Sequence, residues 1–271
     1  MIEPKALARE IASAYANREA TAVPPSAREG GLDLASAYAV EHELMHLRQA
    51  EGHRTVGRKV GFANKAMWRV LKLDTLVWAH MYDNTVRHAA NNEATMSVGN
   101  MIAPKIEPEI VFRMKAPLDG AIDAGPVLHC VESIALGFEI IDCVYPDWKF
   151  TPIDFIAAYG LHAGLIVGAP KAVQPDDITP LIDQLASFTV TLQKNGQTVA
   201  QGSGKNSLKS PALCLGELGA AIVRQGAAPL APGEYVSSGT LTEAQFIAAG
   251  DTYTAVVEGI DLPALTVRIT A

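Results

Sequence analysis

The amino-acid sequence predicts an α+β fold in which a helical N-terminal part is followed by a mixed, coiled β-sheet or β-roll that closes on itself. The first fifty residues space their apolar side chains at helical intervals, whereas the second half is rich in short strand-like segments. The chain has 271 residues, of which 49% are hydrophobic, and this suffices for a substantial core. We expect residues 1–85 to form an N-terminal α/β part and residues 86–271 a β-rich core that carries the functional site, the two parts being interlocked as one functional domain.

Charge and cysteine content exclude several classes of protein. Lys and Arg number 22 against 29 Asp and Glu, so the formal net charge is −7, which argues against nucleic acid or an anionic membrane as the main partner. The three cysteines lack a Cys-x-x-Cys spacing, which predicts reduced thiols rather than a disulfide framework. No stretch approaches the roughly 20 apolar residues that span a bilayer, and the N-terminus lacks an apolar signal core. We therefore expect a cytoplasmic protein with no membrane and no nucleic-acid partner.

The N-terminal part is expected to combine helices with two strands. In the first of these strands Gly57, Lys59 and Gly61 share one face, and glycine on both sides of a lysine leaves space above the backbone for a ligand. Lys59 is therefore a candidate active-site residue, with a surface lysine on an edge strand as the alternative. Apolar spacing and capping residues predict helices over residues 3–19, 33–51 and 64–71, and strands over residues 54–62 and 76–83.

The second helix contains a pattern typical of zinc proteases. Residues 42–46 match H-E-x-x-H, with both histidines on one helical face. The pattern lacks the metzincin continuation, because Gln49 stands where glycine is needed and the next histidine is His53. The helix also alternates like an ordinary amphipathic surface helix, so we expect these histidines to be solvated rather than bound to zinc.

Two strands carry the acidic residues on which the functional prediction depends. Residues 105–112 are predicted to form a strand, and its two-residue repeat places Glu107 and Glu109 side by side on one face. Neighbouring carboxylates repel each other unless a cation lies between them, although a solvated strand face is the alternative. A second apolar strand, residues 136–144, contains Glu139, a carboxylate that needs a partner when it is buried so deeply. Three carboxylates form an all-oxygen ligand set, which favours Mg²⁺ or Mn²⁺.

The rest of the chain is predicted to be strand-rich. Asn195-Gly196 is a strong signal for a type I′ hairpin between strands over residues 188–194 and 198–203. Thr151 and Pro152 have the form of a helix start. The other expected elements are helices over residues 127–134, 152–159 and 210–224, and strands over residues 161–167, 235–240, 251–258 and 265–270.

Three segments together resemble the signature segments of the fumarylacetoacetate hydrolase superfamily, and more narrowly of its 2-hydroxypentadienoate (2-keto-4-pentenoate) hydratase and 4-oxalocrotonate decarboxylase branch. The resemblance covers nearly the whole chain in order, and the Glu-x-Glu pair with the distant glutamate is its specific part. It implies the β-roll of that superfamily, a homo-oligomer and association with a pathway partner enzyme. The three segments are Gly57-Arg58-Lys59-Val60-Gly61-Phe62, Lys105-Ile106-Glu107-Pro108-Glu109-Ile110-Val111-Phe112 and Gly137-Phe138-Glu139-Ile140-Ile141-Asp142.

The resemblance also implies roles for single residues. Lys59 falls on a catalytic lysine, and Asp83 falls where related hydratases carry an acidic residue near the pocket, although a turn aspartate before Asn84 is an equally good account. His162 stands where many relatives carry a small polar residue, and it is a further catalytic candidate although a lone histidine is more often structural. The metal would be held by Glu107, Glu109 and Glu139. Substrate contacts are expected from Phe62, Lys105, Ser238 and Thr240, with a plain strand-end turn as the alternative for the last two.

A site of this kind favours reactions of 2-oxo acids that pass through a dienolate, because a cation stabilises negative charge on the 2-oxygen. The implied enzyme is a lyase, a hydratase that converts 2-hydroxy-2,4-dienoates into 4-hydroxy-2-oxo acids in aromatic-compound catabolism. The alternatives are a decarboxylase of 2-oxo-3-enedioates, an acylpyruvate-type carbon–carbon hydrolase that would use His162, and a catalytically idle partner of such an enzyme. The decarboxylase would need a distal cation for a second carboxylate, and the candidates are Arg58, Arg69, Lys72 and Lys105.

Overall fold

The structure is a computed structural model that describes residues 2–118, 120 and 122–271. Its α-helices are α1 (Pro4–Asn17), α2 (Leu34–Ala50), α3 (Lys65–Leu71), α4 (Ala124–His129), α5 (Pro152–Ile156), α6 (Ile178–Ser187) and α7 (Pro211–Arg224). Its strands are β1 (Thr55–Gly61), β2 (Val77–Tyr82), β3 (Val86–His88), β4 (Glu93–Ser97), β5 (Pro104–Met114), β6 (Val131–Asp142), β7 (His162–Val167), β8 (Lys171–Ala172), β9 (Thr189–Lys194), β10 (Gln197–Ser203), β11 (Tyr235–Ser237), β12 (Gln245–Phe246), β13 (Thr252–Glu258) and β14 (Leu265–Thr270).

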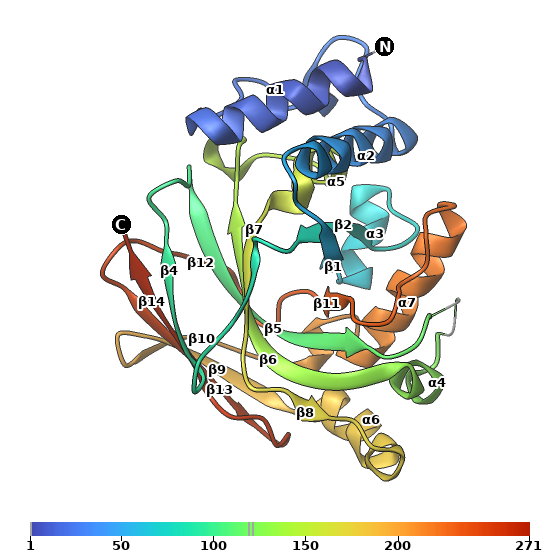
Figure 1. The fold of residues 1–271 in the computed structure, drawn as a ribbon, viewed down its shortest axis with the longest axis vertical. Helices are drawn as coiled ribbons and strands as arrows, with labels where there is room; N and C mark the ends of the chain where they lie inside the picture. Colours follow the sequence, from blue (N-terminus) through green and yellow to red (C-terminus); the bar gives the residue numbers. More distant parts are fainter. Residues whose placement is uncertain (1, 119, 121) are drawn as a thin grey trace.

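The strands of the described residues form two mixed sheets (Figure 1). The larger sheet has nine strands and runs β2-β1-β11-β5-β6-β7-β3, with β12 paired to β5 and β8 paired to β6. The smaller sheet has five strands in the order β10-β9-β13-β14-β4. Both sheets curl, and the helices pack around them, which confirms the predicted α+β fold with a helical N-terminal part.

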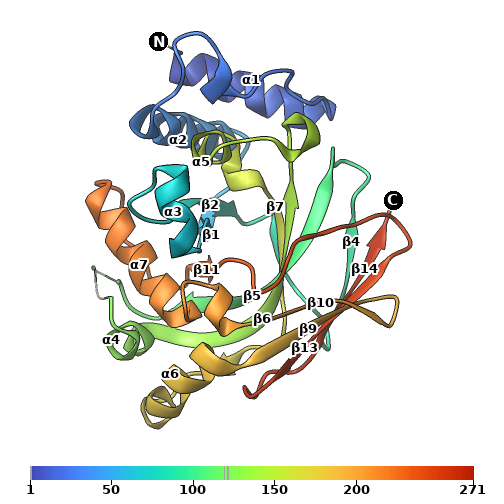
Figure 2. The same ribbon diagram turned by 180° about the vertical axis from the view of Figure 1, so that it is seen from behind.

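The first two helices pack on each other at one end of the larger sheet (Figures 1 and 2). Leu7 and Ile11 of α1 and Val40 and Leu44 of α2 are buried in a shared apolar cluster. Asp33 begins α2 as expected for an N-cap, because its carboxylate accepts a hydrogen bond from the backbone N–H of Ser36 at 2.8 Å. The helical spacing in the sequence therefore predicted both helices correctly.

Strands β5 and β6 form the longest pairing and position the site. On one face Ile106, Ile110 and Phe112 pack into the main core, to which α4, α6 and α7 also contribute along one side of the molecule (Figure 2). On the opposite face, alternation along the strand turns Glu107 and Glu109 away from that core. The two faces thus separate the apolar packing from the acidic side chains.

Several elements differ from the sequence predictions. Residues 127–134, expected as one helix, are divided between α4 and β6, because Val131 and Ser133 pair with the end of β5 and this pairing overrides the local spacing. The strand expected over residues 235–240 ends at Ser237, where the chain turns toward Glu109. Helix α6 and the short strands β3, β4, β8 and β12 were not predicted.

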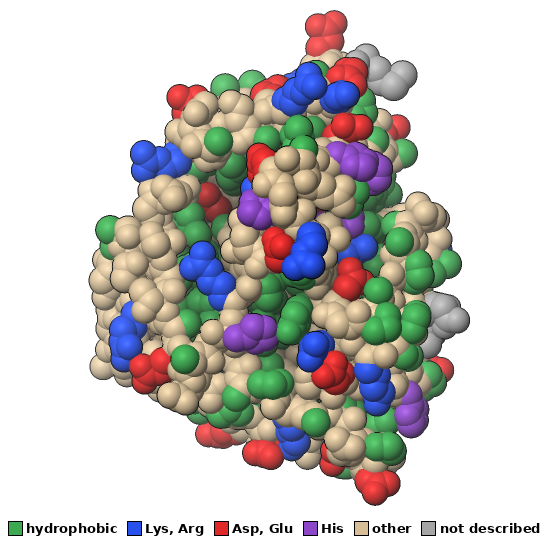
Figure 3. All heavy atoms as spheres, in the orientation of Figure 1, with side chains coloured by type: hydrophobic (Ala, Val, Ile, Leu, Met, Phe, Trp, Pro, Cys, Tyr) green, Lys and Arg blue, Asp and Glu red, His purple; other side chains and the backbone are tan. Residues whose placement is uncertain are grey.

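The two predicted parts of the chain share the larger sheet, since β1 and β2 lie in it together with β5 and β6. The boundary at residue 85 stays a prediction. Within the described residues, no helix has both the length and the apolar character that a bilayer crossing requires. On the face shown in Figure 3, basic and acidic side chains are interspersed among apolar ones.

Candidate metal centre

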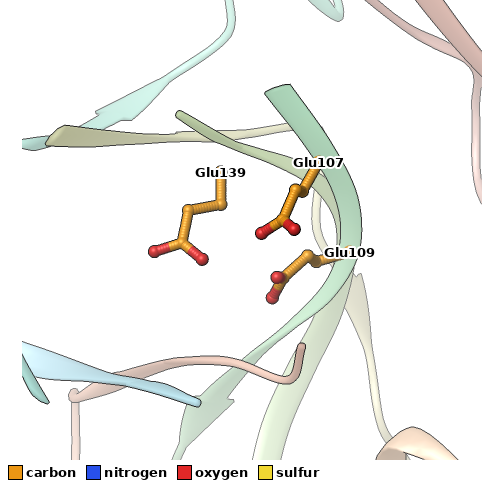
Figure 4. A group of neighbouring side chains, drawn as sticks. All are labelled: Glu107, Glu109 and Glu139. Atoms are coloured by element: carbon orange, nitrogen blue, oxygen red, sulfur yellow. The ribbon is translucent and has the colours of Figure 1, made fainter. Parts of the chain in front are cut away.

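The three predicted metal ligands converge. Antiparallel pairing sets Glu107 of β5 directly opposite Glu139 of β6, and Glu109 opposite Gly137. Directly opposed residues share a face of the sheet with their Cβ atoms only about 5 Å apart. One carboxylate oxygen from each of the three glutamates lies within 4.8 Å of the others, and Figure 4 shows the side chains pointing toward one another from the two strands. Residues that are thirty positions apart in the sequence therefore form a single acidic cluster.

Burial makes this cluster costly without a cation. Glu109 and Glu139 are completely buried, whereas Glu107 is half-buried. Burial, opposed by Lys59 and reinforced by the charge of Glu139, raises the pKa of Glu107 to about 7. Burial and the charges of both other glutamates raise the pKa of Glu109 well above its ordinary value. Burial acts on Glu139 too, but Lys59 and His162 outweigh it, so the pKa of Glu139 is lowered.

The hydrogen bonds leave two acceptor oxygens of the cluster unused. Glu109 Oε2 accepts hydrogen bonds from Ser237 Oγ at 2.6 Å and from the backbone N–H of Gly239 at 2.7 Å. Glu109 Oε1 and Glu139 Oε2 are buried and accept no hydrogen bond from the described residues, although Glu139 Oε2 forms an ion pair with Lys59. Buried acceptors without donors are rare in folded proteins. An all-oxygen set with free lone pairs fits a hard divalent cation such as Mg²⁺ or Mn²⁺.

Lys59 of β1 lies beside the cluster. Its Nζ is 3.0 Å from Glu139 Oε2, donates a hydrogen bond of 3.0 Å to the carbonyl oxygen of Gly160, and lies 4.6 Å from the ring centre of Phe155. Only 2% of its side chain is exposed, which rules out the alternative of a surface lysine. A buried ammonium held on three sides has a fixed position at the edge of the acidic cluster.

The glycines beside Lys59 serve packing rather than ligand access, contrary to the expectation from sequence. A Cβ atom on Gly61 would lie 2.3 Å from the ring of Phe155. A Cβ atom on Gly57 would lie 1.9 Å from the backbone carbonyl oxygen of Tyr235 in the parallel neighbour β11. The missing side chains therefore let a phenyl ring and a neighbouring strand approach β1.

His162, at the start of β7, contacts the cluster directly. Its Nδ1 lies 2.9 Å from Glu139 Oε1, and its Nε2 lies 2.9 Å from the hydroxyl oxygen of Thr85. Its side chain is 1% exposed. Because a carboxylate accepts the contact at Nδ1, that nitrogen carries a proton. Both ring nitrogens are engaged, which orients Glu139 and leaves no free nitrogen to act as a base on water.

A cavity of about 590 Å³ opens beside the cluster and is within the range of small-molecule sites. Lys59 and Glu107 line it, as do three of the predicted substrate-binding residues, Phe62, Lys105 and Thr240. A second hollow of about 650 Å³ lies beside α1 and is a more open surface depression that contains none of the predicted site residues. The chemistry therefore points to the first cavity although the second is larger.

Two predicted site residues lie neither in the lining of this cavity nor among the residues of the acidic cluster and its side-chain contacts. Asp83 lies in the turn after β2, 29% exposed, and pairs with His53 and Arg54 at 3.4 Å each, so the turn alternative describes it and we withdraw it as a catalytic candidate. Ser238 is buried outside the cavity lining, where its carbonyl oxygen accepts a hydrogen bond from Ser207.

Sequence reasoning missed Ser237 and Gly239, which bind Glu109, and Thr85, which binds His162. The sequence did contain a signal for the first two of these residues. The two-residue repeat of an extended segment places residues 237 and 239 on the same face. The H-E-x-x-H histidines, His42 and His46, are both exposed on α2, as expected.

Comparisons with known proteins show which enzymes this chain resembles. No protein-family model matches the chain. The chain is 29% identical over 210 residues to 2-hydroxypent-2,4-dienoate hydratase of Pseudomonas putida, covering 77% of this chain and 90% of that protein. It is 28% identical over 230 residues to 4-oxalocrotonate decarboxylase of Pseudomonas sp. (strain CF600), covering 84% of this chain and 83% of that protein.

Solved structures give the same result. The structure of 4-oxalocrotonate decarboxylase from Pseudomonas putida, complexed with magnesium and adipate, matches with a TM-score of 0.87 at 25% identity and covers 98% of this chain and 97% of that one. Fumarylpyruvate hydrolase from Pseudomonas aeruginosa, in complex with Mn²⁺ and pyruvate, matches with a TM-score of 0.59 at 16% identity over 80% and 89% of the two chains, and shows the fold alone. The resemblance of the three sequence segments is thereby confirmed.

Proposed function

We propose that this chain, a homologue of the hydratases and decarboxylases of the fumarylacetoacetate hydrolase superfamily, is a divalent-metal-dependent hydratase. Its substrates are 2-hydroxy-2,4-dienoates of the 2-keto-4-pentenoate type and its products are 4-hydroxy-2-oxo acids, as in aromatic-compound catabolism. One observation carries the proposal. Glu107, Glu109 and Glu139 converge on one point with unused buried oxygens, next to a buried lysine and an open cavity.

The three glutamates are the metal ligands in this proposal. When bound there, Mg²⁺ or Mn²⁺ supplies a Lewis acid that stabilises negative charge on the 2-oxygen of a 2-oxo acid. Ser237 and Gly239 hold Glu109, and His162 holds Glu139, so each of these ligands is oriented by hydrogen bonds. Such outer contacts keep ligand oxygens in place and are part of the site. His162 is accordingly a positioning residue.

Lys59 is the residue that we assign to proton transfer. It lines the cavity and is held at 3.0 Å from both Glu139 Oε2 and the carbonyl oxygen of Gly160. An ammonium in this position donates a proton to the substrate next to its 2-oxygen, and the neutral amine that remains can take one back, so the same side chain serves as general acid and then as general base. Phe62, Phe150 and Phe155 line the same cavity and limit the access of bulk water.

The two alternatives are not equally supported. Decarboxylation of a 2-oxo-3-enedioate uses the same ligands and the same lysine, and the similarity to 4-oxalocrotonate decarboxylases favours it as the second candidate. Carbon–carbon hydrolysis of an acylpyruvate needs a base that activates water. The engagement of both ring nitrogens of His162 removes the histidine that the hydrolase hypothesis relied on.

The assembly and location of the protein are further parts of the proposal. We infer a cytoplasmic homo-oligomer that associates with a pathway partner enzyme. The absence of a membrane-spanning helix from the described residues and the family resemblance support this inference. Light scattering on the purified protein tests it, and a mass equal to that of one 28.8 kDa chain would contradict the oligomer.

An ultraviolet assay tests the activity. The protein is offered 2-hydroxypenta-2,4-dienoate and 2-oxo-3-hexenedioate side by side, with Mg²⁺ and with a chelator. We expect the dienoate chromophore to disappear as water adds, and turnover to stop when the metal is removed. Release of CO₂ from the second substrate with no hydration of the first would instead establish the decarboxylase, and turnover that survives chelation would overturn the metal-dependent proposal.

A further inference from the structure

We propose that the substrate carries a second anionic group at its distal end, and that Lys105 and the indole N–H of Trp148 bind this group. The inference rests on the proposed function, because the glutamate-held cation must bind the 2-oxo acid end of the same molecule. It shifts the preferred substrate from the 2-keto-4-pentenoate type, which has no distal carboxylate, to 2-oxo or 2-hydroxy dienoates that carry one, whichever of the two lyase reactions follows.

The structure selects Lys105 among the four cations considered from the sequence. Arg58 lies on the opposite face of β1 from Lys59, pairs with Glu234 at 2.8 Å, and lines a different cavity. Arg69 and Lys72 are exposed on α3 and at its end, and neither lines the cavity of the metal centre. Lys105 does line it. Among the described residues around that cavity, Lys59 is the other basic side chain, and it is already paired with Glu139.

Lys105 is held in place without an acidic partner. Its Nζ lies 4.0 Å from the ring centre of Trp148 and 4.4 Å from that of Phe246, in two cation–π contacts. In the described part of the chain, no carboxylate oxygen lies within 4.0 Å of this ammonium. The exposed Glu243 also lines the cavity, but it forms no ion pair with Lys105. The ammonium is thus available to an anion that enters the cavity.

The spacing along β5 fits the length of such a substrate. Lys105 and Glu107 are two positions apart and share a face of the strand, so their Cα atoms are separated by about 7 Å. The two carboxylates of a six-carbon dicarboxylate are separated by a chain of five carbon–carbon bonds of about 1.5 Å each, which spans about 6 Å along its zigzag. One end of the molecule can therefore reach the glutamate cluster while the other reaches Lys105.

Trp148 provides an independent indication. Its Nε1 is buried and finds no hydrogen-bond acceptor in the part of the chain that the structure describes, and the residue lines the same cavity. Asp147 and Trp148 have φ angles of 55° and 57°, a left-handed conformation that is strained for a bulky side chain. Such strain persists where the surrounding structure imposes it, and it gathers at ligand sites. The ring that carries this unpaired N–H is the one on which the Lys105 ammonium rests, and a carboxylate has two oxygens with which to accept from both groups.

A pair of unreactive ligands tests the proposal on the Mg²⁺-loaded protein. 2-Oxohexanedioate and 2-oxohexanoate share the 2-oxo acid end and differ in whether a carboxylate or a methyl group stands at the far end. Calorimetry should show the diacid binding about tenfold more tightly or better, which corresponds to one modest ionic contact. Lys105→Met should abolish this preference and leave the affinity for the monoacid unchanged. Trp148→Phe, which keeps the ring and removes the N–H, should reduce the preference several-fold.

The control is Lys72→Met, which removes an exposed lysine outside the cavity and should leave both affinities at the wild-type level. Equal binding of the two ligands by the wild-type protein would overturn the inference and leave the proposed function standing. A preference that survives in both Lys105→Met and Trp148→Phe would overturn it as well. Failure of both ligands to bind in the presence of Mg²⁺ would refute the proposed function itself, and with it this inference.

Discussion

Glu139 is the residue that contacts both the buried lysine and the buried histidine of the site. One of its oxygens contacts Lys59 and the other contacts His162, while its strand position sets it opposite Glu107. A buried carboxylate with this many neighbours is tuned by them, and here their charges lower its pKa although burial alone would raise it. Glu139 is therefore the ligand that stays ionised when its two acidic neighbours hold protons.

Replacing Glu139 by glutamine should abolish metal binding and activity. The amide keeps the size of the side chain but removes the charge and one acceptor oxygen, so we expect Mg²⁺ affinity to fall on the order of 100-fold or more, beyond the roughly 10- to 100-fold typical of outer contacts. Calorimetric titration with Mg²⁺ measures this. Glu132→Gln is the matched control, because Glu132 is exposed and pairs only with Arg113. Undiminished activity of Glu139→Gln would remove the metal proposal.

Substitutions of His162 distinguish a role in positioning Glu139 from a direct role in catalysis. His162→Ala should weaken Mg²⁺ binding by about 10- to 100-fold, because Glu139 loses a hydrogen-bond donor. Activity should recover largely at saturating Mg²⁺, and His162→Asn, which returns an N–H near the place of Nδ1, should restore part of the affinity. If kcat stayed low at saturating metal while Mg²⁺ affinity stayed at the wild-type level, His162 would be a catalytic residue after all.

The sequence predicted the members of the acidic cluster better than the contacts around them. Period-two alternation placed Glu107 and Glu109 on one face, and the apolar surroundings of Glu139 marked it as a carboxylate that needs a partner. The convergence itself depends on the register of β5 on β6, which is set by long-range pairing and has no local signal. The same limit explains Asp83, whose turn geometry and ion pairs became visible only in the structure.

At the scale of elements, the turn between α5 and β7 positions the lysine. Tyr159, Gly160 and Leu161 all have positive φ angles, of 55°, 59° and 56°, and this strained turn directs the carbonyl oxygen of Gly160 at Lys59 Nζ. A Cβ atom on Gly160 would lie 2.8 Å from that of Ala79 and 2.9 Å from Lys59 Cδ. The turn and the lysine therefore depend on each other.

Gly160→Ala should lower activity as a substitution of Lys59 does, because it displaces the lysine side chain while leaving the residue in place. We expect kcat to fall as it does in Lys59→Met, where loss of general acid–base catalysis costs about 10²- to 10⁴-fold, while Mg²⁺ affinity stays within a few-fold of the wild type. Steady-state kinetics together with Mg²⁺ titration separates the two quantities. Gly196→Ala is a control of the same chemistry, because Gly196 also has a positive φ, of 80°, but lies in the β9–β10 hairpin with open space around it. Full activity in Gly160→Ala would show that the turn does not position Lys59.

Element boundaries show where local patterns fail. The start of α2 at Asp33, the helix start at Thr151 and Pro152, and the Asn195-Gly196 hairpin were all predicted, since each depends on neighbours in sequence. Residues 131–134 were predicted to be helical because their apolar spacing fits a helix, but partners on β5 and β8 draw them into the sheet. Local sequence patterns thus predicted the elements whose stabilising contacts are local. They did not predict the strands that form by pairing with a strand distant in the sequence.

For the molecule as a whole, the acidic cluster makes the free energy of unfolding depend on pH and on the binding of a metal ion. The pKa of Glu107 is raised from its ordinary value of 4.5 to about 7, so the folded metal-free protein binds more protons than the unfolded chain between these values. Stability of the metal-free protein should therefore fall as pH rises through this window. The raised pKa of Glu109 acts in the same direction, while the lowered pKa of Glu139 matters only below its ordinary value of 4.5.

Mg²⁺ should accordingly stabilise the protein more at high pH than at low pH, because the ion must compete with protons for Glu107 and Glu109. We expect a larger rise in Tm on addition of Mg²⁺ at pH 8 than at pH 5.5, and saturation at a hundred times Kd adds about 2.7 kcal/mol. Thermal melts with and without Mg²⁺ at the two pH values measure the effect. An equal rise at both would show that protons and metal do not share a site.

The most direct test of the metal centre is an anomalous difference map from a crystal of the protein soaked in Mn²⁺. We predict one strong peak between the carboxylates of Glu107, Glu109 and Glu139, which is lost from a Glu139→Gln crystal treated in the same way. A map with no peak at this position, or with Mn²⁺ bound only elsewhere, would contradict it.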